Sequence, residues 1–346
     1  MTPAQQQAQE QRNQYVAEMV KKAQTDEELF VAKRYYGLGG SDMSALLGTS
    51  KWRTPYELWM DKTFRGTKAV KNDLPFEVGH YLEALVAERY EQTTDYEVRE
   101  ATEVHMKEYP FLIGNFDRLV VKDGKVIGGL ECKTTASNNK IIVNGIERSK
   151  WGQPNIYNNH ELVSESSEID PEYYAQVQFY LMVSGLTWWD VGVLINNSDL
   201  RFYRINRDKE FIDNMLTKTV DFWLNNVLGD VPPAMTYTDN QSTSWDEVSI
   251  QASAEMTDLV SKYKSLELQK SAIEEQQKPL LDKISVLMGN NSKATYVDEN
   301  GKTKTLLTFK GSNRTSFDSK KFQQDMPDVY KRYQTTIQTK RSLRFY

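Results

Sequence analysis

Apolar side chains recur at the spacing of an α-helix in three segments, residues 76–91, 171–183 and 211–228. Positions three and four residues apart lie on the same side of a helix, so each segment predicts a helix with a buried face. The second segment begins at Pro171, a residue that is favoured in the first turn of a helix. Gln176 interrupts its apolar pattern, and a glutamine on a buried face needs hydrogen-bond partners.

Strand-like runs surround the turn sequence Asp123-Gly124, over residues 114–120 and 127–135. An Asp-Gly pair between two such runs predicts a β-hairpin. The preceding run, residues 97–108, predicts a strand that opens the same sheet. The region therefore predicts a sheet that contains at least one antiparallel hairpin.

A second hairpin is predicted by the runs 189–195 and 200–205, which alternate around Asn197-Ser198. The dipeptide Pro232-Pro233 then marks a domain boundary. Beyond this boundary, apolar residues fall at alternating intervals of three and four, which predicts either the seam of a coiled coil or a helix packed along a surface. The residues of this seam are Leu259, Tyr263, Leu266, Ile273, Leu280, Ile284 and Leu287.

The charge of the chain is unevenly distributed. The 346 residues carry a net charge of −5, but residues 301–346 contain 11 Lys or Arg against 3 Asp, a balance of +8. The remainder therefore carries −13, so any surface that binds nucleic acid has to be a local basic track. A single cysteine excludes intramolecular disulfides and predicts a reducing compartment, the cytoplasm. The polar start and the lack of a long apolar run predict no signal peptide and no membrane association.

Candidate metal ligands lie on the first predicted hairpin. Side chains alternate between the faces of a strand, so Glu131 and Lys133 share one face and Cys132 lies on the other. Asp117 lies on the neighbouring strand. Two carboxylates beside an amine predict a Mg²⁺ site with room for a phosphate, because Mg²⁺ prefers carboxylate oxygens and keeps several waters. The alternative is an exposed hairpin with cross-strand charge pairs.

Glu83 borders the apolar face of the helix predicted for residues 76–91. A carboxylate at the edge of a buried face needs a partner, which is either a metal ion or a neighbouring cation such as Arg89. His80 lies one helical turn from Glu83 and is interpreted as a surface residue.

Arg34 and Ser41 flank a glycine-rich segment that leads into a short predicted helix, for which Ser41 is the expected N-cap. Free backbone N–H groups, a hydroxyl group and a nearby guanidinium group could bind an anion together. A capped helix without a ligand has the same sequence pattern, so this alternative stays open.

Taken in order, these segments resemble the YqaJ-type viral recombinase nucleases, which are relatives of phage lambda exonuclease in the PD-(D/E)xK superfamily. The resemblance extends from about residue 34 to about residue 223. It rests on Gly39-Gly40-Ser41-Asp42, on Gly79 with Glu83, on Asp117, on Glu131 with Lys133, and on Ala175-Gln176-Val177-Gln178.

The resemblance implies an α/β (α+β) fold, in which a PD-(D/E)xK nuclease core consists of a central mixed β-sheet flanked by helices, followed by a helical C-terminal extension. The expected organisation is an N-terminal helical arm (1–30), a nuclease domain (31–235), a long coiled-coil-like helical segment (245–290) and a basic C-terminal region (291–346). Residues 136–170 depart from the family pattern. This long loop carries Lys140, Arg148, Lys150 and Trp151, and is either a DNA contact or a poorly ordered insertion.

The resemblance also assigns roles to individual residues. Glu83, Asp117, Glu131 and the backbone carbonyl of Cys132 would bind Mg²⁺ or Mn²⁺, as two ions. Lys133 would orient or activate the attacking water, with Gln176 in support. Arg34 and Ser41 would bind the 5′-terminal phosphate of DNA.

These assignments predict a 5′→3′ double-strand DNA exonuclease of a phage or prophage recombination system. The implied partners are double-stranded DNA ends, a single-strand annealing protein and further copies of the chain in a ring, often a trimer. One alternative is an endonuclease or a RecB-like nuclease on the same core. The other is a scaffold without catalytic activity that binds DNA ends.

Overall fold

The computed structural model describes residues 1–66, 74–143, 146–236, 239, 250–298, 301–311, 315–334 and 343. The chain divides into two compact units, Met1–Asp239 and Asn240–Tyr346. Within the described ranges, no helix combines the length and the apolar character that are needed to cross a lipid bilayer.

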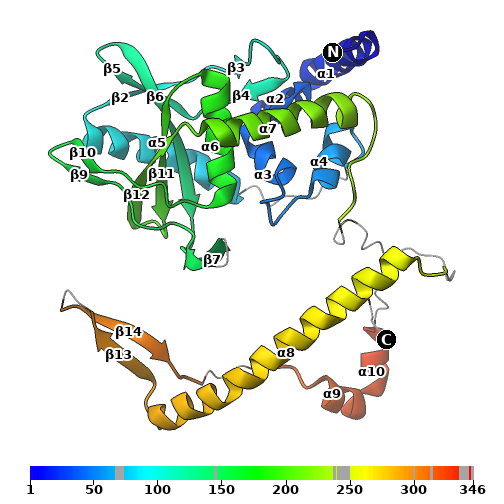
Figure 1. The fold of residues 1–346 in the computed structure, drawn as a ribbon, viewed down its shortest axis with the longest axis vertical. Helices are drawn as coiled ribbons and strands as arrows, with labels where there is room; N and C mark the ends of the chain where they lie inside the picture. Colours follow the sequence, from blue (N-terminus) through cyan, green and yellow to red (C-terminus); the bar gives the residue numbers. More distant parts are fainter. Residues whose placement is uncertain are drawn as a thin grey trace. The chain divides into compact units, whose positions relative to one another are not determined.

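A five-stranded mixed sheet forms the centre of the first unit (Figure 1). Its strand order is β12-β11-β6-β5-β2, with β6 and β11 parallel and every other pair antiparallel. The strands are β2 (Glu97–Glu100), β5 (Arg118–Lys122), β6 (Lys125–Thr135), β11 (Trp188–Ile195) and β12 (Asp199–Asn206). The two predicted hairpins are therefore confirmed, as is the strand that was expected to open the sheet, which forms its edge.

The turn between β5 and β6 has the backbone conformation that its sequence predicts. Asp123 has φ 50° and Gly124 has φ 73°. Positive φ at both central residues matches a two-residue type I′ turn, whose twist suits a hairpin. This turn sets the register in which Lys122 pairs with Lys125, and a β-bulge between Val120 and Val121 then shifts the pairing by one residue, so that Arg118 pairs with Leu130.

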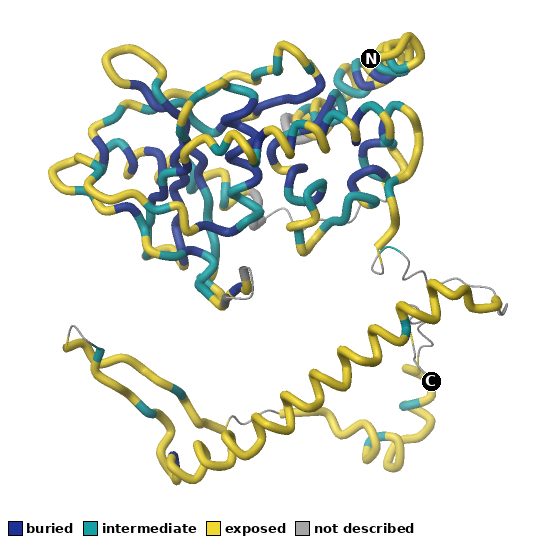
Figure 2. Tube along the Cα trace, in the orientation of Figure 1, coloured by how far each residue is buried: buried dark blue, intermediate teal, exposed yellow. Residues whose placement is uncertain are grey.

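Helices cover both faces of the sheet, which confirms the predicted fold class of a mixed sheet flanked by helices. On one face, Leu130 and Cys132 pack with Val86 and Tyr90 of α5 (Leu74–Thr94). On the other face, the core includes Trp189, Val191 and residues of α6 (Pro171–Ser184), α7 (Lys209–Asp221) and the adjoining π-helix Phe222–Val227. Figure 2 shows this buried centre in dark blue.

The segments before α5 pack against the same unit. In α1 (Pro3–Lys22), Gln9 accepts a hydrogen bond of 2.7 Å from the Trp223 indole, and Arg12 donates one of 2.9 Å to the carbonyl of Tyr35. Next come α2 (Asp26–Lys33), the 3₁₀ turns Arg34–Tyr36 and Gly40–Asp42, α3 (Met43–Leu46) and α4 (Pro55–Lys62). A small sheet in the order β1-β4-β3 joins Leu38–Gly39, Leu112–Gly114 and Val104–His105.

Residues 136–170 contain regular structure in their described part, so the expectation of a poorly ordered insertion is wrong there. Trp151 is fully buried and stacks on Tyr173 with ring centroids 5.2 Å apart, which makes it a core residue rather than a DNA contact. Residues 144–145 lie outside the described part. The strands form two hairpins, β7 (Lys140–Val143) with β8 (Ile146–Ser149) and β9 (Ile156–Asn158) with β10 (Glu161–Ser164).

The second unit consists of one long helix and shorter elements. The helix α8 (Ala254–Met288) runs through Pro279, and it begins with a hydrogen bond from the Met256 N–H to the Ser253 hydroxyl. Of the expected helical segment 245–290, residues 245–249 lie outside the described residues. The other elements are the antiparallel pair β13 (Lys293–Val297) and β14 (Thr303–Thr308) and the helices α9 (Ser319–Asp325) and α10 (Pro327–Arg332).

We expect a protein that ends at Asp239 to fold and to keep the sheet intact. The hydrophobic core of the sheet comes from the first unit, and Thr54 donates a hydrogen bond of 2.5 Å to Asp239 at the end of that unit. Circular dichroism and thermal melting should give a cooperative transition within a few degrees of that of the same unit in the full-length protein. An insoluble or molten product would show that the second unit is part of the core.

Candidate metal centre and neighbouring anion site

Asp117 is fixed at the start of β5. Its Oδ2 accepts a hydrogen bond of 2.8 Å from the backbone N–H of Cys132 on β6. Because Arg118 pairs with Leu130, the antiparallel register brings Asp117 alongside the first carboxylate of β6, Glu131. The sequence prediction that these two acids meet is borne out by this register.

Glu131 is buried, with 1% of its surface exposed, and it faces α6. Its Oε1 accepts a hydrogen bond of 2.6 Å from Gln176 Nε2 and forms an ion pair with Lys133. Its other oxygen, Oε2, is buried without a hydrogen-bond partner. Burial and the charge of Asp117 raise the pKa of Glu131 to about 8, although Lys133 acts in the opposite direction. A buried carboxylate oxygen without a donor is costly, and a cation beside this oxygen would relieve that cost.

Lys133 keeps its charge despite its surroundings. Burial acts to lower the pKa of its amine, but the neighbouring carboxylates Glu131 and Asp117 outweigh burial and raise it. The amine also lies 5.4 Å from the centre of the Tyr173 ring. The side chain retains 22% exposure, so the ammonium group can reach a ligand from solvent.

Glu83 reaches the same site from α5. Burial and the charge of Asp117 raise the pKa of this half-buried carboxyl, while His80 and Lys133 act to lower it. His80 lies 3.4 Å from Glu83, with its own side chain largely exposed. The structure thus brings Glu83, Asp117 and Glu131 into one electrostatic neighbourhood.

This donor set fits a divalent cation. Mutual repulsion among the carboxylates and the unpartnered Glu131 oxygen would both be relieved by positive charge. Across the described ranges, no three His, Cys, Asp or Glu side chains converge closely enough to hold an ion by themselves. Mg²⁺ usually takes one or two protein carboxylates and keeps several waters, so a smaller set of side chains is sufficient.

Gln176 links this site to a second cluster. Its Nε2 also lies 2.7 Å from the Tyr180 hydroxyl, one helical turn further along α6. A Cβ atom at Gly40 would lie 2.5 Å from the Tyr180 ring and 3.1 Å from Gln176, so only glycine fits at this contact. The glycine-rich segment therefore packs directly against the side chains that hold Glu131.

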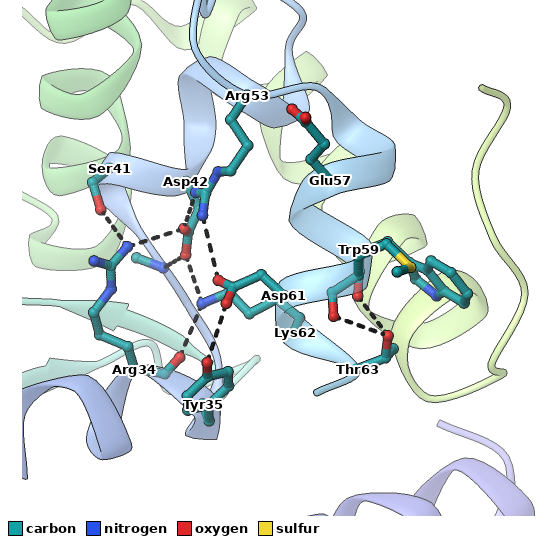
Figure 3. Close-up of polar contacts among 12 residues, drawn as sticks. Arg34, Tyr35, Ser41, Asp42, Arg53, Glu57, Trp59, Asp61, Lys62 and Thr63 are labelled. Carbon is teal, nitrogen blue, oxygen red and sulfur yellow. Dashed lines mark hydrogen bonds and ion pairs between the residues drawn. The ribbon is translucent and has the colours of Figure 1, made fainter. Parts of the chain in front are cut away.

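The second cluster surrounds Asp42, which is fully buried (Figure 3). One carboxylate oxygen lies 2.6 Å from Arg53 and 3.3 Å from Arg34. The other lies 2.8 Å from Lys62 and accepts a hydrogen bond of 3.0 Å from the N–H of Gly39. Burial acts to raise the pKa of Asp42, but the three cations outweigh burial and hold it far below its usual range.

Arg34 and Ser41 meet as predicted, with a hydrogen bond of 3.1 Å from the guanidinium group to the hydroxyl group. The expected N-cap is wrong, however. Ser41 lies inside a 3₁₀ turn, makes no capping bond, and precedes an α-helix of only four residues. The helix-dipole argument for an anion site therefore fails, and the positive charge comes from side chains instead.

Sequence reasoning missed several members of these two clusters. Arg53 comes from the loop before α4, and Lys62 is buried at the end of that helix. Lys62 also donates to the carbonyls of Arg34 and Gly37 at 2.9 Å each, so it holds the backbone of the glycine-rich segment. Burial is the largest influence on Lys62 and lowers its pKa to about 8. Of these missed residues, Tyr180 is the one that a sequence pattern could have indicated. It lies four residues after Gln176, so the two side chains lie on the same side of the predicted helix.

Residues 29–187 match the family model of the YqaJ-like viral recombinase domain. This segment contains both clusters. This segment resembles the YqaJ-like viral recombinase family. The resemblance stated from the motifs is thereby confirmed.

This chain is similar to one curated protein and to several solved structures. The uncharacterized protein YqaJ of Bacillus subtilis (strain 168) is 28% identical over 328 residues, which cover 91% of this chain and 92% of that protein. Among solved structures, an alkaline exonuclease from Laribacter hongkongensis is 18% identical, with a TM-score of 0.41, over 60% of this chain and 94% of that one. A phage-related exonuclease from Haemophilus somnus 129PT is 13% identical, with a TM-score of 0.37, over 56% and 95% of the two chains.

Proposed function

We propose that this protein is a metal-dependent deoxyribonuclease that digests double-stranded DNA from its 5′ ends. The observation that carries the proposal is the group of buried Glu131 and Gln176 with half-buried Asp117 and Lys133, in the segment that matches the YqaJ-like model, with one Glu131 oxygen left without a hydrogen-bond partner. Exonuclease activity in proteins of similar architecture agrees with this reading.

Glu83, Asp117, Glu131 and the backbone carbonyl of Cys132 would hold Mg²⁺ or Mn²⁺, in our proposal as two ions. When bound, these ions would lower the pKa of the attacking water and stabilise the charge that develops on the phosphate. Gln176 fixes the orientation of the Glu131 carboxylate through its hydrogen bond of 2.6 Å. Lys133 supplies a permanent positive charge where the attacking water and the phosphate oxygens would lie.

The anion site would bind the terminal 5′-phosphate through Arg34 and Ser41. Arg34 can turn toward a phosphate at little cost, because its 3.3 Å contact is the longest of those to Asp42. Arg53, Lys62 and the Gly39 N–H would continue to compensate that buried carboxylate. The contact of Gly40 with Tyr180 and Gln176 would place the phosphate beside the catalytic group.

Arg34→Ala should slow digestion of 5′-phosphorylated duplexes much more than digestion of 5′-hydroxyl duplexes. The loss of one charge-assisted hydrogen bond costs roughly 1.5–3 kcal/mol, which is roughly a 10- to 150-fold change in rate at low substrate. Initial rates on the two substrates give the ratio directly. Arg99→Ala is the matched control, because that arginine is exposed on β2 and, among the described residues, pairs with Glu97. Equal slowing on both substrates would assign Arg34 to holding Asp42 alone.

The proposed reaction is tested by end-labelled linear duplexes and closed circular DNA, incubated with Mg²⁺ or with EDTA. Mononucleotides released from 5′ ends of linear DNA, with intact circles and no reaction in EDTA, are the expected result. Cleavage of closed circles would favour an endonuclease or RecB-like activity instead. Binding to ends without any cleavage would favour the scaffold.

The biological setting in our proposal is recombination in the cytoplasm of a bacterial host. A single-strand annealing protein would receive the strand that digestion exposes. Several copies of this chain would assemble with one another as a homo-oligomer. The family resemblance suggests that this homo-oligomer is a ring.

A further inference from the structure

The helix α8 carries a stripe of leucine and isoleucine at every seventh residue. Leu259, Leu266, Ile273, Leu280 and Leu287 are each between 57% and 85% exposed. Figure 2 shows almost the whole helix in the colour of exposed residues. At 1.5 Å per residue the helix is about 52 Å long. A stripe of exposed apolar side chains that follows most of such a helix indicates an interaction surface.

The spacing identifies the kind of surface. If the five stripe residues are d positions of a heptad, the a positions three residues before them form the second row of the seam. This row consists of Met256, Tyr263, Lys270, Gln277 and Ile284. Pro279 falls at a c position, away from the seam, where a missing backbone N–H does not disturb packing between helices.

We propose that α8 pairs with α8 of a second copy of this chain as a parallel, two-stranded coiled coil. Leucine at d with polar residues at some a positions favours two strands, because larger bundles bury the a positions more completely. Lys270 and Gln277 are the polar a residues, and the long lysine stem lets its amine leave the seam toward Glu267 and Glu274 at the flanks.

Charge selects the parallel orientation. In a parallel pair, each g residue faces the e residue five positions later on the partner, so Lys262 faces Glu267 and Gln269 faces Glu274. In the antiparallel register that overlaps the whole helix, e positions face each other, and Glu267 of one copy lies opposite Glu274 of the other. The parallel pair gains an attraction where the antiparallel pair has a repulsion.

This inference is independent of the proposed nuclease chemistry, because it concerns only the second unit. Each coiled coil would join two nuclease units through the amino-terminal ends of their α8 helices. A processive nuclease would gain a second DNA-binding unit by this means.

Disulfide trapping tests the pairing in the full-length protein. Ile273→Cys places a thiol at a central d position, where a parallel pair brings the two copies of the same residue together. Leu268→Cys is the matched control, because residue 268 is an f position on the outside of the coil and is 73% exposed. The single native cysteine, Cys132, is buried and should give no background.

Under mild oxidation, Ile273→Cys should yield a species of twice the chain mass on a non-reducing gel, and Leu268→Cys should not. A monomeric Ile273→Cys protein would overturn the proposal, and so would equal cross-linking of both variants. A helix α8 that is covered by another protein leaves Ile273→Cys unlinked in the same way.

Solution mass provides a second, independent readout. Leu266→Asn with Leu280→Asn should weaken the association through α8 by roughly a hundredfold or more, since each change removes a buried leucine from both copies. Any ring formed by the first unit would keep its own mass in this variant. Leu268→Asn with Val286→Asn makes the same chemical change outside the seam and should have no effect. A wild-type monomer in sedimentation equilibrium at tens of micromolar would overturn the proposal. Glu267→Lys decides the orientation, because it should weaken a parallel pair, where residue 267 faces Lys262, and strengthen an antiparallel one, where it faces Glu274. In the parallel pair, adding Lys262→Glu should restore the association.

Discussion

Glu131→Gln should reduce cleavage of duplex DNA by at least a thousandfold, roughly, while the protein stays folded. The substitution keeps the size of the side chain and lets Gln176 continue to donate its hydrogen bond, but it removes the negative charge that would hold the cation. In the Glu131→Gln protein, the Lys133 ammonium group still has the Asp117 carboxylate nearby, and its side chain is 22% exposed. The substitution therefore does not leave Lys133 as an isolated buried charge. Initial rates in Mg²⁺, together with melting curves, measure the two effects separately.

Glu97→Gln is the control for this experiment. Glu97 lies on the edge strand β2, is more than half exposed, and pairs with Arg99 within the part of the chain that the structure describes. Its replacement should leave both the rate and the melting temperature unchanged, because exposed ion pairs contribute little. A folded Glu131→Gln protein that cleaves at a rate near that of the wild type would remove Glu131 from the proposed centre.

Asp190→Ala should have the opposite profile, with a large loss of stability and little effect on the chemistry. Asp190 is fully buried on β11, next to Leu130 in the sheet, and faces α5 rather than the site. It pairs with Arg204 and accepts a hydrogen bond of 2.6 Å from the Tyr90 hydroxyl. Removing one partner of a buried ion pair costs about 3–5 kcal/mol, because it leaves an uncompensated charge. Denaturant unfolding measures this loss.

Replacing both partners tests the reason for the loss. Asp190→Leu combined with Arg204→Met leaves no unpaired charge and should recover much of the stability. Arg204 lies 3.7 Å from the centre of the Trp188 ring, so methionine can keep part of that packing. Asp190→Ala protein that is as stable as the wild type would show that the network contributes nothing to the fold.

The parts of the site that could be predicted depend on short-range patterns. The Asp123-Gly124 turn fixes one register, and strand alternation then places Glu131 and Lys133 on one face. Both follow from the backbone geometry of a hairpin, which the local sequence determines. Asp117 comes alongside Glu131 because the β-bulge between Val120 and Val121 shifts the register of the turn by one residue.

The parts that escaped prediction depend on contacts between distant elements. Arg53 and Lys62 meet Asp42 only after α4 has folded back onto the glycine-rich segment, and no spacing in the sequence records this contact. Ser41 was assigned to a helix cap because a capping serine and a ligand-binding serine follow the same local pattern. Trp151 was read as a loop residue, since a run without clear periodicity does not show that one side chain enters the core.

The central claim is that these carboxylates hold a divalent ion, and calorimetric titration of the protein with Mn²⁺ tests it most directly. Wild-type protein should bind Mn²⁺ without DNA present, and Glu97→Gln should bind it with the same affinity. Glu131→Gln should lose at least tenfold in affinity, roughly, because a buried charged ligand is removed. Equal Mn²⁺ binding by wild type and Glu131→Gln, or none by either, would contradict a metal centre at this site.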